Sequence, residues 1–151
     1  SAQPIISYYF GQQTPGRVER TIRLALKTAL GCGIFFFAAM LVFNHQMVGL
    51  FIDKSYQAYD IALNGIPYFA AGYLFFALNI VGIGYYQSIE RARRATVITL
   101  FRGTLFMLAG FLLLPPVLGV RGIWLAVPLA ELLTLLLIIG IYLKDSFTVR
   151  R

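Results

Sequence analysis

The sequence has 151 residues, of which 59% are hydrophobic and 13% are charged, and its mean hydropathy is +0.76. A soluble domain typically carries about 25% charged residues, so this chain has too little polar surface to cover a water-soluble globule. The net charge of +7 would point to nucleic acid in a soluble protein. In a membrane protein, the positions of Lys and Arg in the loops indicate which side of the membrane each loop is on. We therefore expect no nucleic acid partner.

The first predicted element is the end of a preceding transmembrane helix over residues 1–11. Its residues lack the charged n-region of a signal peptide, so we expect the sequence to continue from a longer protein. Residues 12–23 are predicted to form a cytoplasmic basic link. Within and just after it, Arg20, Arg23 and Lys27 form a cationic stripe at spacings of three and four residues. Binding to anionic lipid headgroups is favoured for this stripe over contact with a substrate.

Four apolar stretches follow, and each reaches the roughly 20 residues that a helix needs to cross a bilayer. They cover residues 24–43, 61–86, 95–118 and 123–143. None alternates with a period of two, so the predicted fold is an all-α polytopic membrane protein with four transmembrane helices. A short apolar tail in the membrane interface is expected at 47–52. Pro115 and Pro116 are expected to end the third span, and the last span is expected to stop at Lys144, where a cytoplasmic tail, 144–151, begins.

The connections between these spans alternate between rich and poor in cations. The cation-rich connections lie before the first span (Arg17, Arg20, Arg23 and Lys27), between the second and third (Arg91, Arg93 and Arg94) and after the fourth (Lys144, Arg150 and Arg151). The cation-poor connections contain only Lys54 and Arg121, respectively. Cation-rich loops stay in the cytoplasm. The pattern therefore predicts that both termini are cytoplasmic.

The second span carries a polar and aromatic stripe. At 100° per residue, Asn64, Tyr68, Phe75 and Asn79 share one face with several glycines. Two interpretations stay open: the amides bond to a neighbouring helix and the glycines allow close packing, or the stripe lines an aqueous cavity that binds substrate. Gly65 and Pro67 are expected to loosen the outer end of this span.

The fourth span carries an acid, Glu131, on a face that it shares with Trp124, Pro128 and Leu135. An ionisable group inside a span is a candidate functional group, here for handling protons or cations. The alternative is a structural ion pair, for which Arg102 in the third span is the candidate partner. Counting turns from the helix ends predicts different depths for the two residues, and Arg102 could instead extend to the inner headgroups.

The sequence contains no pattern of a catalytic site. The single histidine, His45, cannot form a histidine-based metal cluster, and the single cysteine, Cys32, lies in an apolar run where packing is its expected role. There is no Ser-His-Asp set, phosphate-binding loop or dinucleotide fingerprint. We therefore expect no enzyme, no catalytic residues, no metal site and no cofactor.

Three segments together resemble transporters of the multidrug and toxic compound extrusion (MATE) family. They are Gln3-Pro4-Ile5-Ile6-Ser7-Tyr8 with Gly11 and Arg17-Val18, then Tyr85-Tyr86-Gln87-Ser88, and last Leu114-Pro115 with Gly119-Val120-Arg121-Gly122-Ile123-Trp124 and Pro128. The order, the spacing and the predicted topology resemble the family over nearly the whole chain. One departure is Tyr9-Phe10-Gly11, where many members have Asn-Tyr-Gly.

The resemblance implies that the four spans are helices nine to twelve of a twelve-helix antiporter, within its C-terminal lobe. It implies the N-terminal lobe of the same protein and membrane lipids as partners. It also implies export of small organic, often cationic, compounds across the plasma membrane (the inner membrane in bacteria), driven by a sodium or proton gradient. One branch of the family has an acid in the middle of the tenth helix, where this chain has Asn79, and Glu131 is then the candidate coupling acid.

Two alternatives remain open. A lipid-linked sugar flippase of the same superfamily would line its cavity with several basic residues, whereas only Arg102 is a basic candidate in the later spans. A small four-helix membrane scaffold subunit would transport nothing.

Overall fold

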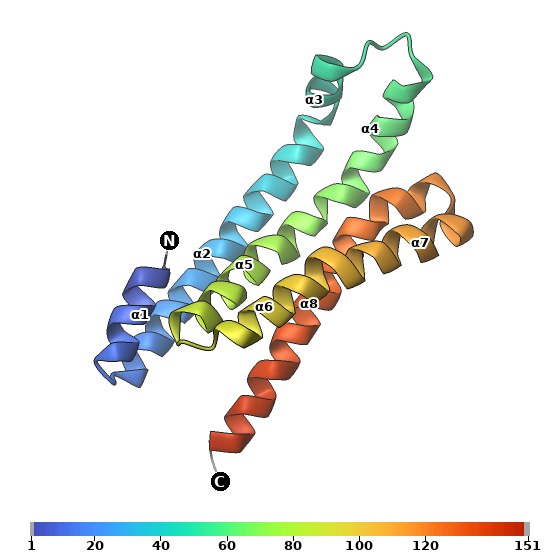
Figure 1. The fold of residues 1–151 in the computed structure, drawn as a ribbon. Coiled ribbons are helices and arrows are strands. Elements are labelled where there is room, and N and C mark those ends of the chain that lie inside the picture. The colour runs from blue at the N-terminus through green and yellow to red at the C-terminus, as the bar shows by residue number, and fades with distance from the viewer. Residues whose placement is uncertain (1, 150–151) are drawn as a thin grey trace.

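The computed structural model describes residues 2–149, and the side chains of residues 2–145. Over this range the chain is helical, with no strand, and Figure 1 shows the helices in chain order. They are α1 (Gln3–Gly11), α2 (Pro15–Val42), α3 (Asn44–Phe51), α4 (Gln57–Ala70), α5 (Gly72–Ser88), α6 (Ala92–Leu100), the π-helical segment η1 (Phe101–Phe106), α7 (Met107–Leu118) and α8 (Val120–Val149). Residues 1, 150 and 151, which include part of the expected cytoplasmic tail, lie outside the described range.

The helices confirm the all-α membrane fold. Three segments, Pro15–Val42, Ala92–Leu118 and Val120–Asp145, are long and apolar enough to cross a bilayer. The pair α4 and α5 makes a fourth span if the two are counted together, with a bend of 41° between them. This bend lies just after Pro67, which cannot donate a backbone hydrogen bond and crowds the preceding turn. The loosening was expected at the end of the span near Gly65 and Pro67, whereas the helix breaks between Ala70 and Gly72, near the middle of the pair.

Several helix boundaries differ from the sequence-based expectations. Helix α2 already begins at Pro15, so most of the expected link 12–23 is helical; proline suits the first turn because no helical bond needs its N–H. The third span ends at Leu118, as its predicted bounds have it, with Pro115 and Pro116 inside the last turn of α7. Helix α8 continues past Lys144 to Val149. A few polar residues do not break a helix when its backbone bonds can continue.

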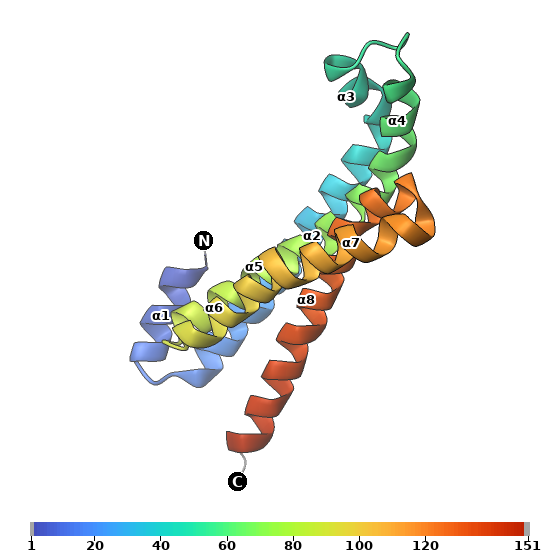
Figure 2. The same cartoon turned by 45° about the vertical axis from the view of Figure 1, so that its right-hand side comes forward.

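The two ends of the molecule carry different charges (Figures 1 and 2). The end of α1, the start of α2, the α5–α6 loop and the end of α8 lie at one end, and the α3–α4 and α7–α8 connections lie at the other. Among the described residues the first end holds eight cations and three acids: Arg17, Arg20, Arg23, Lys27, Arg91, Arg93, Arg94 and Lys144, with Glu19, Glu90 and Asp145. The opposite end holds Lys54 and Arg121 with Asp53 and Asp60. We call the first the cation-rich end.

Helix α8 is the most enclosed of the spans. In its most apolar stretch 39% of the residues are buried, against 6% for α2 and 11% for the span that contains α6 and α7. It contacts α4 and α5 on one side and η1 and α7 on the other. Large apolar side chains such as Leu24, Phe35 and Leu112 project outward from the other helices, as side chains that face lipid do.

Close contacts fix the register of α7 against α8. The chain reverses at Gly119, whose φ of +60° favours glycine. A Cβ atom on Gly122 would lie 2.5 Å from the backbone of Leu114, and one on Gly110 would lie 3.1 Å from the carbonyl oxygen of Ala126. Residue 114 is therefore level with 122, and residue 110 with 126.

Polar contacts and an apolar core join the helices at the cation-rich end. Arg91, in the loop after α5, donates to Asp145 of α8 over 2.6 Å, and Arg94 pairs with the same carboxylate. The amide of Gln3 in α1 donates to Gln87 of α5 over 2.7 Å. Beneath these contacts lies a buried apolar cluster made of Ile6, Val18, Ile83, Tyr86, Ile89, Ala95, Ile98 and Ile138. This end of the molecule is thus connected across α1, α2, α5, α6 and α8.

Candidate functional site

Three polar side chains from three spans meet inside the helix group. The guanidinium of Arg102 binds the carboxylate of Glu131 with Nη2 2.8 Å and Nε 2.9 Å from Oε1, and Nε also lies 3.1 Å from Oε2. The amide Nδ2 of Asn79 donates to Glu131 Oε2 over 2.7 Å and to the Glu131 carbonyl over 2.8 Å. We call these residues the Asn79–Arg102–Glu131 cluster. It matches the structural ion pair that sequence analysis offered as an alternative.

The cluster is enclosed by protein. Asn79 is fully buried, and the side chains of Glu131 and Arg102 are 8% and 18% exposed. The guanidinium also lies over the ring of Phe76, 4.8 Å from its centre, an arrangement in which the ring face attracts the cation. Within lipid, unpaired charges and amides cost several kcal/mol each, so this mutual pairing explains how three polar groups reach the middle of the spans.

Arg102 lies in the π-helical segment η1, at residues 101–106. Such segments replace the usual i→i+4 bonds by i→i+5 bonds and occur frequently at functional sites. Figure 1 shows η1 between α6 and α7 within one continuous helical span. The irregular turn therefore coincides with the position from which Arg102 reaches Glu131 of α8.

The depths expected for Arg102 and Glu131 were wrong. The contacts of Gly122 with Leu114 and of Gly110 with Ala126 set the register of the pair. Extending that register places residue 105 level with Glu131, only three residues from Arg102. Three residues correspond to about 4.5 Å along a helix, which an arginine side chain can bridge. Counting turns from the predicted helix ends could not give this register, because it depends on the contacts at the α7–α8 turn.

The predicted stripe of the second span faces α8. A Cβ atom on Gly65 would enter the ring of Trp124, one on Gly72 would touch Pro128, and one on Gly82 would lie 2.9 Å from Ile138. Asn79 lies between these glycines and bonds to Glu131. In the described residues its amide is thus part of helix packing and does not line a cavity, as the first of the two interpretations predicts.

The other stripe residues are divided by the bend between α4 and α5. Asn64 and Tyr68 line a pocket of about 360 Å³ near the α7–α8 turn, together with Arg121 and Trp124. The Asn64 amide donates to the carbonyl of Asp60 in its own helix. Phe75 is half-buried farther along, in α5. The sequence-based stripe assumed one straight helix, and the 41° bend separates its two halves.

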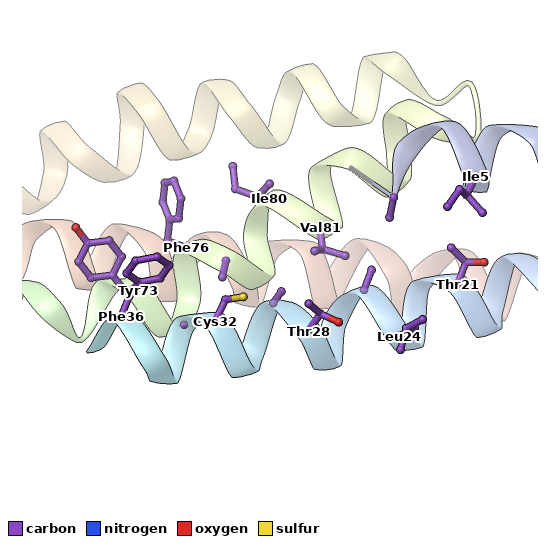
Figure 3. Close-up of a pocket in the computed structure, with 15 residues that line it drawn as sticks. Ile5, Thr21, Leu24, Thr28, Cys32, Phe36, Tyr73, Phe76, Ile80 and Val81 are labelled. Atoms are coloured by element: carbon purple, nitrogen blue, oxygen red, sulfur yellow. The ribbon is translucent and has the colours of Figure 1, made fainter. Parts of the chain in front are cut away.

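A larger apolar cavity lies on the other side of α5, between α1, α2 and α5 (Figure 3). Its volume is about 700 Å³. Figure 3 shows Thr28, Cys32 and Phe36 of α2 opposite Tyr73, Phe76 and Ile80 of α5, with Ile5 of α1 at one end. We call it the α2–α5 cavity. Sequence analysis assigned Cys32 to packing and did not identify this cavity, which depends on the relative positions of three helices.

Three other polar or aromatic contacts were missed. Phe76 under the guanidinium gave no signal in the sequence. Thr134, fully buried one turn after Glu131, donates to the Ala130 carbonyl over 2.7 Å. Asn44 donates to the carbonyl of Leu63 over 2.9 Å. This last contact could have been anticipated, because Pro67 leaves the carbonyl four residues before it without its helical partner.

The chemistry available to the cluster is ionic. Among the described residues, no three His, Cys, Asp or Glu side chains gather where they could hold a metal. The Glu131 carboxylate accepts bonds from both Arg102 and Asn79. Any change in its charge would therefore act on contacts with η1 and α5 together.

Comparisons with known proteins give a shared fold and a family. The chain is similar to a solved structure described as the outward-facing conformation of a multidrug resistance MATE family transporter of the MOP superfamily, with a TM-score of 0.87 and 14% sequence identity. That match covers 99% of this chain and 34% of the transporter, so the chain spans about a third of the transporter's length. No curated protein matches the sequence. The MatE family model matches residues 1–112, and the chain therefore belongs to the MatE family.

Proposed function

We propose that this chain forms part of the C-terminal lobe of a secondary active transporter that exports small organic compounds, cationic ones among them, by antiport with sodium ions or protons. The observation that carries the proposal is that the whole helix arrangement is shared with a multidrug resistance MATE transporter. Membership of the MatE family supports it independently. The N-terminal lobe of the same protein would complete the transporter, since alternating access needs two bodies that move around a site between them.

The α2–α5 cavity supports lipophilic organic substrates. Its lining is apolar and includes the rings of Phe36, Tyr73 and Phe76. Aromatic faces attract organic cations without needing a buried acid. In the last three spans of the described chain, the cation that lies away from the helix ends, Arg102, is already paired with Glu131. An anionic lipid-linked sugar would need unpaired basic residues, so this pairing favours export of organic compounds over the flippase alternative.

Glu131 is the acid proposed to couple transport to an ion gradient. Among the described residues, it is the one Asp or Glu whose side chain is buried, whereas Glu19, Asp60 and Asp145 lie near the ends of their helices. A proton or sodium ion that binds its carboxylate would weaken the bonds to Arg102, because the guanidinium and the ion compete for the same oxygens. Weakening those bonds would release η1 from α8. The cluster would thereby link ion binding to movement of the third span.

The transport proposal can be tested with the full-length protein in proteoliposomes. We expect a fluorescent lipophilic cation to accumulate against its gradient when a sodium or proton gradient is imposed, and accumulation to stop when an ionophore collapses that gradient. Transport that is independent of both gradients would contradict antiport.

A substitution tests the role of Glu131. Glu131→Gln should reduce gradient-driven transport by about tenfold or more, a loss of about 1.4 kcal/mol. The exposed Glu90→Gln should leave it unchanged. Equal transport by both variants would leave Glu131 with a structural role.

The orientation in the plasma membrane is proposed from the charge difference between the two ends. Cation-rich connections stay in the cytoplasm, so the cation-rich end should be cytoplasmic, with both termini on that side. Reporter fusions after Ser55 and after Arg151 should report an external and a cytoplasmic position, respectively. The reverse result would contradict this topology.

A further inference from the structure

A second apolar groove lies in the cation-rich half of the molecule, between α2 and α8. Its walls include Leu26 and Leu30 of α2 and Leu135 and Ile139 of α8, and Leu78 and Gly82 of α5 form part of its floor. Its volume is about 570 Å³. We call it the α2–α8 groove. Its lining contains no residue of the Asn79–Arg102–Glu131 cluster, and most of its α5 residues differ from those that line the α2–α5 cavity.

The length of the groove fits half of a bilayer. Its α2 residues run from Glu19 to Leu30, and its α8 residues run from Leu135 to Tyr142. At 1.5 Å per residue these segments are roughly 10 to 17 Å long, close to the roughly 15 Å of one leaflet's hydrocarbon region. Each segment has one end near the cation-rich end of the molecule and the other towards the membrane centre. An extended apolar chain that enters from that end would therefore lie along Leu26, Leu30 and Ile139.

Cations stand at the mouth of the groove. Arg23 and Lys27 line it one turn apart on α2. Arg23 pairs with Glu19 over 2.7 Å, but both side chains are about two-thirds exposed, and such pairs contribute at most about 1 kcal/mol. Among the described residues, Lys27 has no carboxylate partner. Both cations can thus turn towards an anion that sits above the apolar part of the groove.

Tyrosines complete the mouth on the opposite wall. Tyr85 of α5 and Tyr142 of α8 line the groove, with their ring centres 6.4 Å apart. Tyrosine is enriched at the level of lipid headgroups, where its ring is in hydrocarbon and its hydroxyl meets polar groups. From its mouth inwards the groove is therefore charged, then aromatic, then apolar. This order matches the phosphate, the interface region and the acyl chain of a phospholipid.

We propose that the α2–α8 groove binds one anionic phospholipid of the leaflet at the cation-rich end. Its phosphate group contacts Arg23 and Lys27, and an acyl chain lies between α2 and α8 over Gly82. A Cβ atom on Gly82 would lie 2.9 Å from Ile138, so this glycine lets α8 approach α5 at the floor of the groove. A lipid held there joins α2 to α8 at the end where Asp145 already connects α8 to the α5–α6 loop.

The proposal is tested with the full-length protein by native mass spectrometry after reconstitution in vesicles of phosphatidylglycerol, or of phosphatidylcholine. We expect one phosphatidylglycerol to remain bound after detergent extraction and phosphatidylcholine to be removed. The double variant Arg23→Gln/Lys27→Gln should lower retention of phosphatidylglycerol by about tenfold or more, because it removes both charge contacts to the phosphate. The matched control, Arg17→Gln/Arg93→Gln, removes the same charge from the same end but away from the groove and should retain the lipid.

A second pair of variants tests the apolar part. Ile139→Trp places a ring in the groove and should also lower retention, whereas Leu136→Trp, one turn away on the same helix and outside the groove lining, should not. Both positions are about half exposed, so neither ring has to enter the core. Equal retention of the two lipids would overturn the proposal, and so would equal losses in the groove variants and their controls. Complete absence of bound lipid, as expected if another segment of the protein or a second copy fills the groove, would overturn it as well.

Discussion

On the side of α5 that faces α8, polar groups are enclosed and glycines allow the helices to touch, whereas the side that faces α2 borders an open apolar cavity of about 700 Å³. Asn79 is fully buried on the first side, and Cys32 of α2 is exposed towards the cavity on the second. Phe76 lies between them: its ring contacts Arg102 and also lines the cavity. The difference shows that the charged side chains beside α5 lie where several helices surround them. The α2–α5 cavity, in contrast, is lined mainly by apolar side chains.

This division has a physical basis. A charged or amide group without partners is costly in hydrocarbon, so the Asn79–Arg102–Glu131 cluster requires close contact between three spans. An apolar cavity needs no such partners and can accept lipid chains or lipophilic substrates. One helix can therefore serve as a fixed support on one side and as the wall of a binding space on the other.

The largest expected effect is on the cluster itself. Arg102→Gln should destabilise the protein by about 3 to 5 kcal/mol, because the Glu131 carboxylate would lose its counter-charge within the spans. Unfolding free energy in mixed micelles is the measurement. The exposed Arg121→Gln should change it by less than about 0.5 kcal/mol. The double variant Arg102→Met/Glu131→Leu should be more stable than Arg102→Gln. Similar stabilities for Arg102→Gln and Arg121→Gln would mean that the cluster is not sealed.

A smaller effect is expected where α4 contacts α8. Gly65→Ala should cost about 1 to 3 kcal/mol, because its Cβ would lie 2.0 Å from the Trp124 ring and the indole would have to move. Gly31 in α2 has no atom within 4 Å of such a Cβ. Gly31→Ala should therefore be neutral or stabilise the protein by up to about 1 kcal/mol, from helix propensity alone. If both substitutions had the same effect on unfolding free energy, the contact of α4 with α8 would be no tighter than the surroundings of Gly31 in α2.

Thiol labelling compares the two sides of α5 directly. Cys32 should react with a membrane-permeant thiol reagent because its side chain is exposed towards the cavity. In a Cys32→Ala background, Asn79→Cys should react at least about tenfold more slowly, since reaching it requires local opening that costs on the order of 1.4 kcal/mol or more. Equal rates would show that water or reagent enters between α5 and α8, and would restore the cavity interpretation of Asn79.

The smallest expected effect concerns the outer half of the second span. Asn44→Ala should cost about 1 to 2 kcal/mol, because the Leu63 carbonyl would lose its donor. In a Pro67→Ala background the same substitution should cost less than about 0.5 kcal/mol, since the new backbone N–H can bond to Leu63 within the helix. Unfolding free energies of the four proteins in this cycle give the coupling. Independent, additive effects would contradict the assignment of Asn44 as the replacement donor for the proline.

The two faces that the sequence predicted on different spans are in contact with each other. Periodicity alone put Asn79 on one stripe, and Glu131 on a face with Trp124 and Pro128. In the structure the glycines beside Asn79 touch Trp124 and Pro128, and Asn79 bonds to Glu131. Periodicity could identify each face because burial of a polar group repeats with the helical turn. It could not identify the partner, since periodicity carries no information on which helices are neighbours.

The sequence by itself determined that the chain is a helical membrane protein, because hydropathy acts locally along the chain. Loop charge predicts in the same local way how the spans alternate across the membrane. The sequence also singled out Arg102 and Glu131 as candidate partners. Tertiary structure alone decided that they are level enough to pair, since that depends on the contacts of Gly110 and Gly122. It also decided the two hollows beside α5. These depend on how separate helices are placed against one another, and small shifts in register or angle change such contacts without changing the pattern of any single helix.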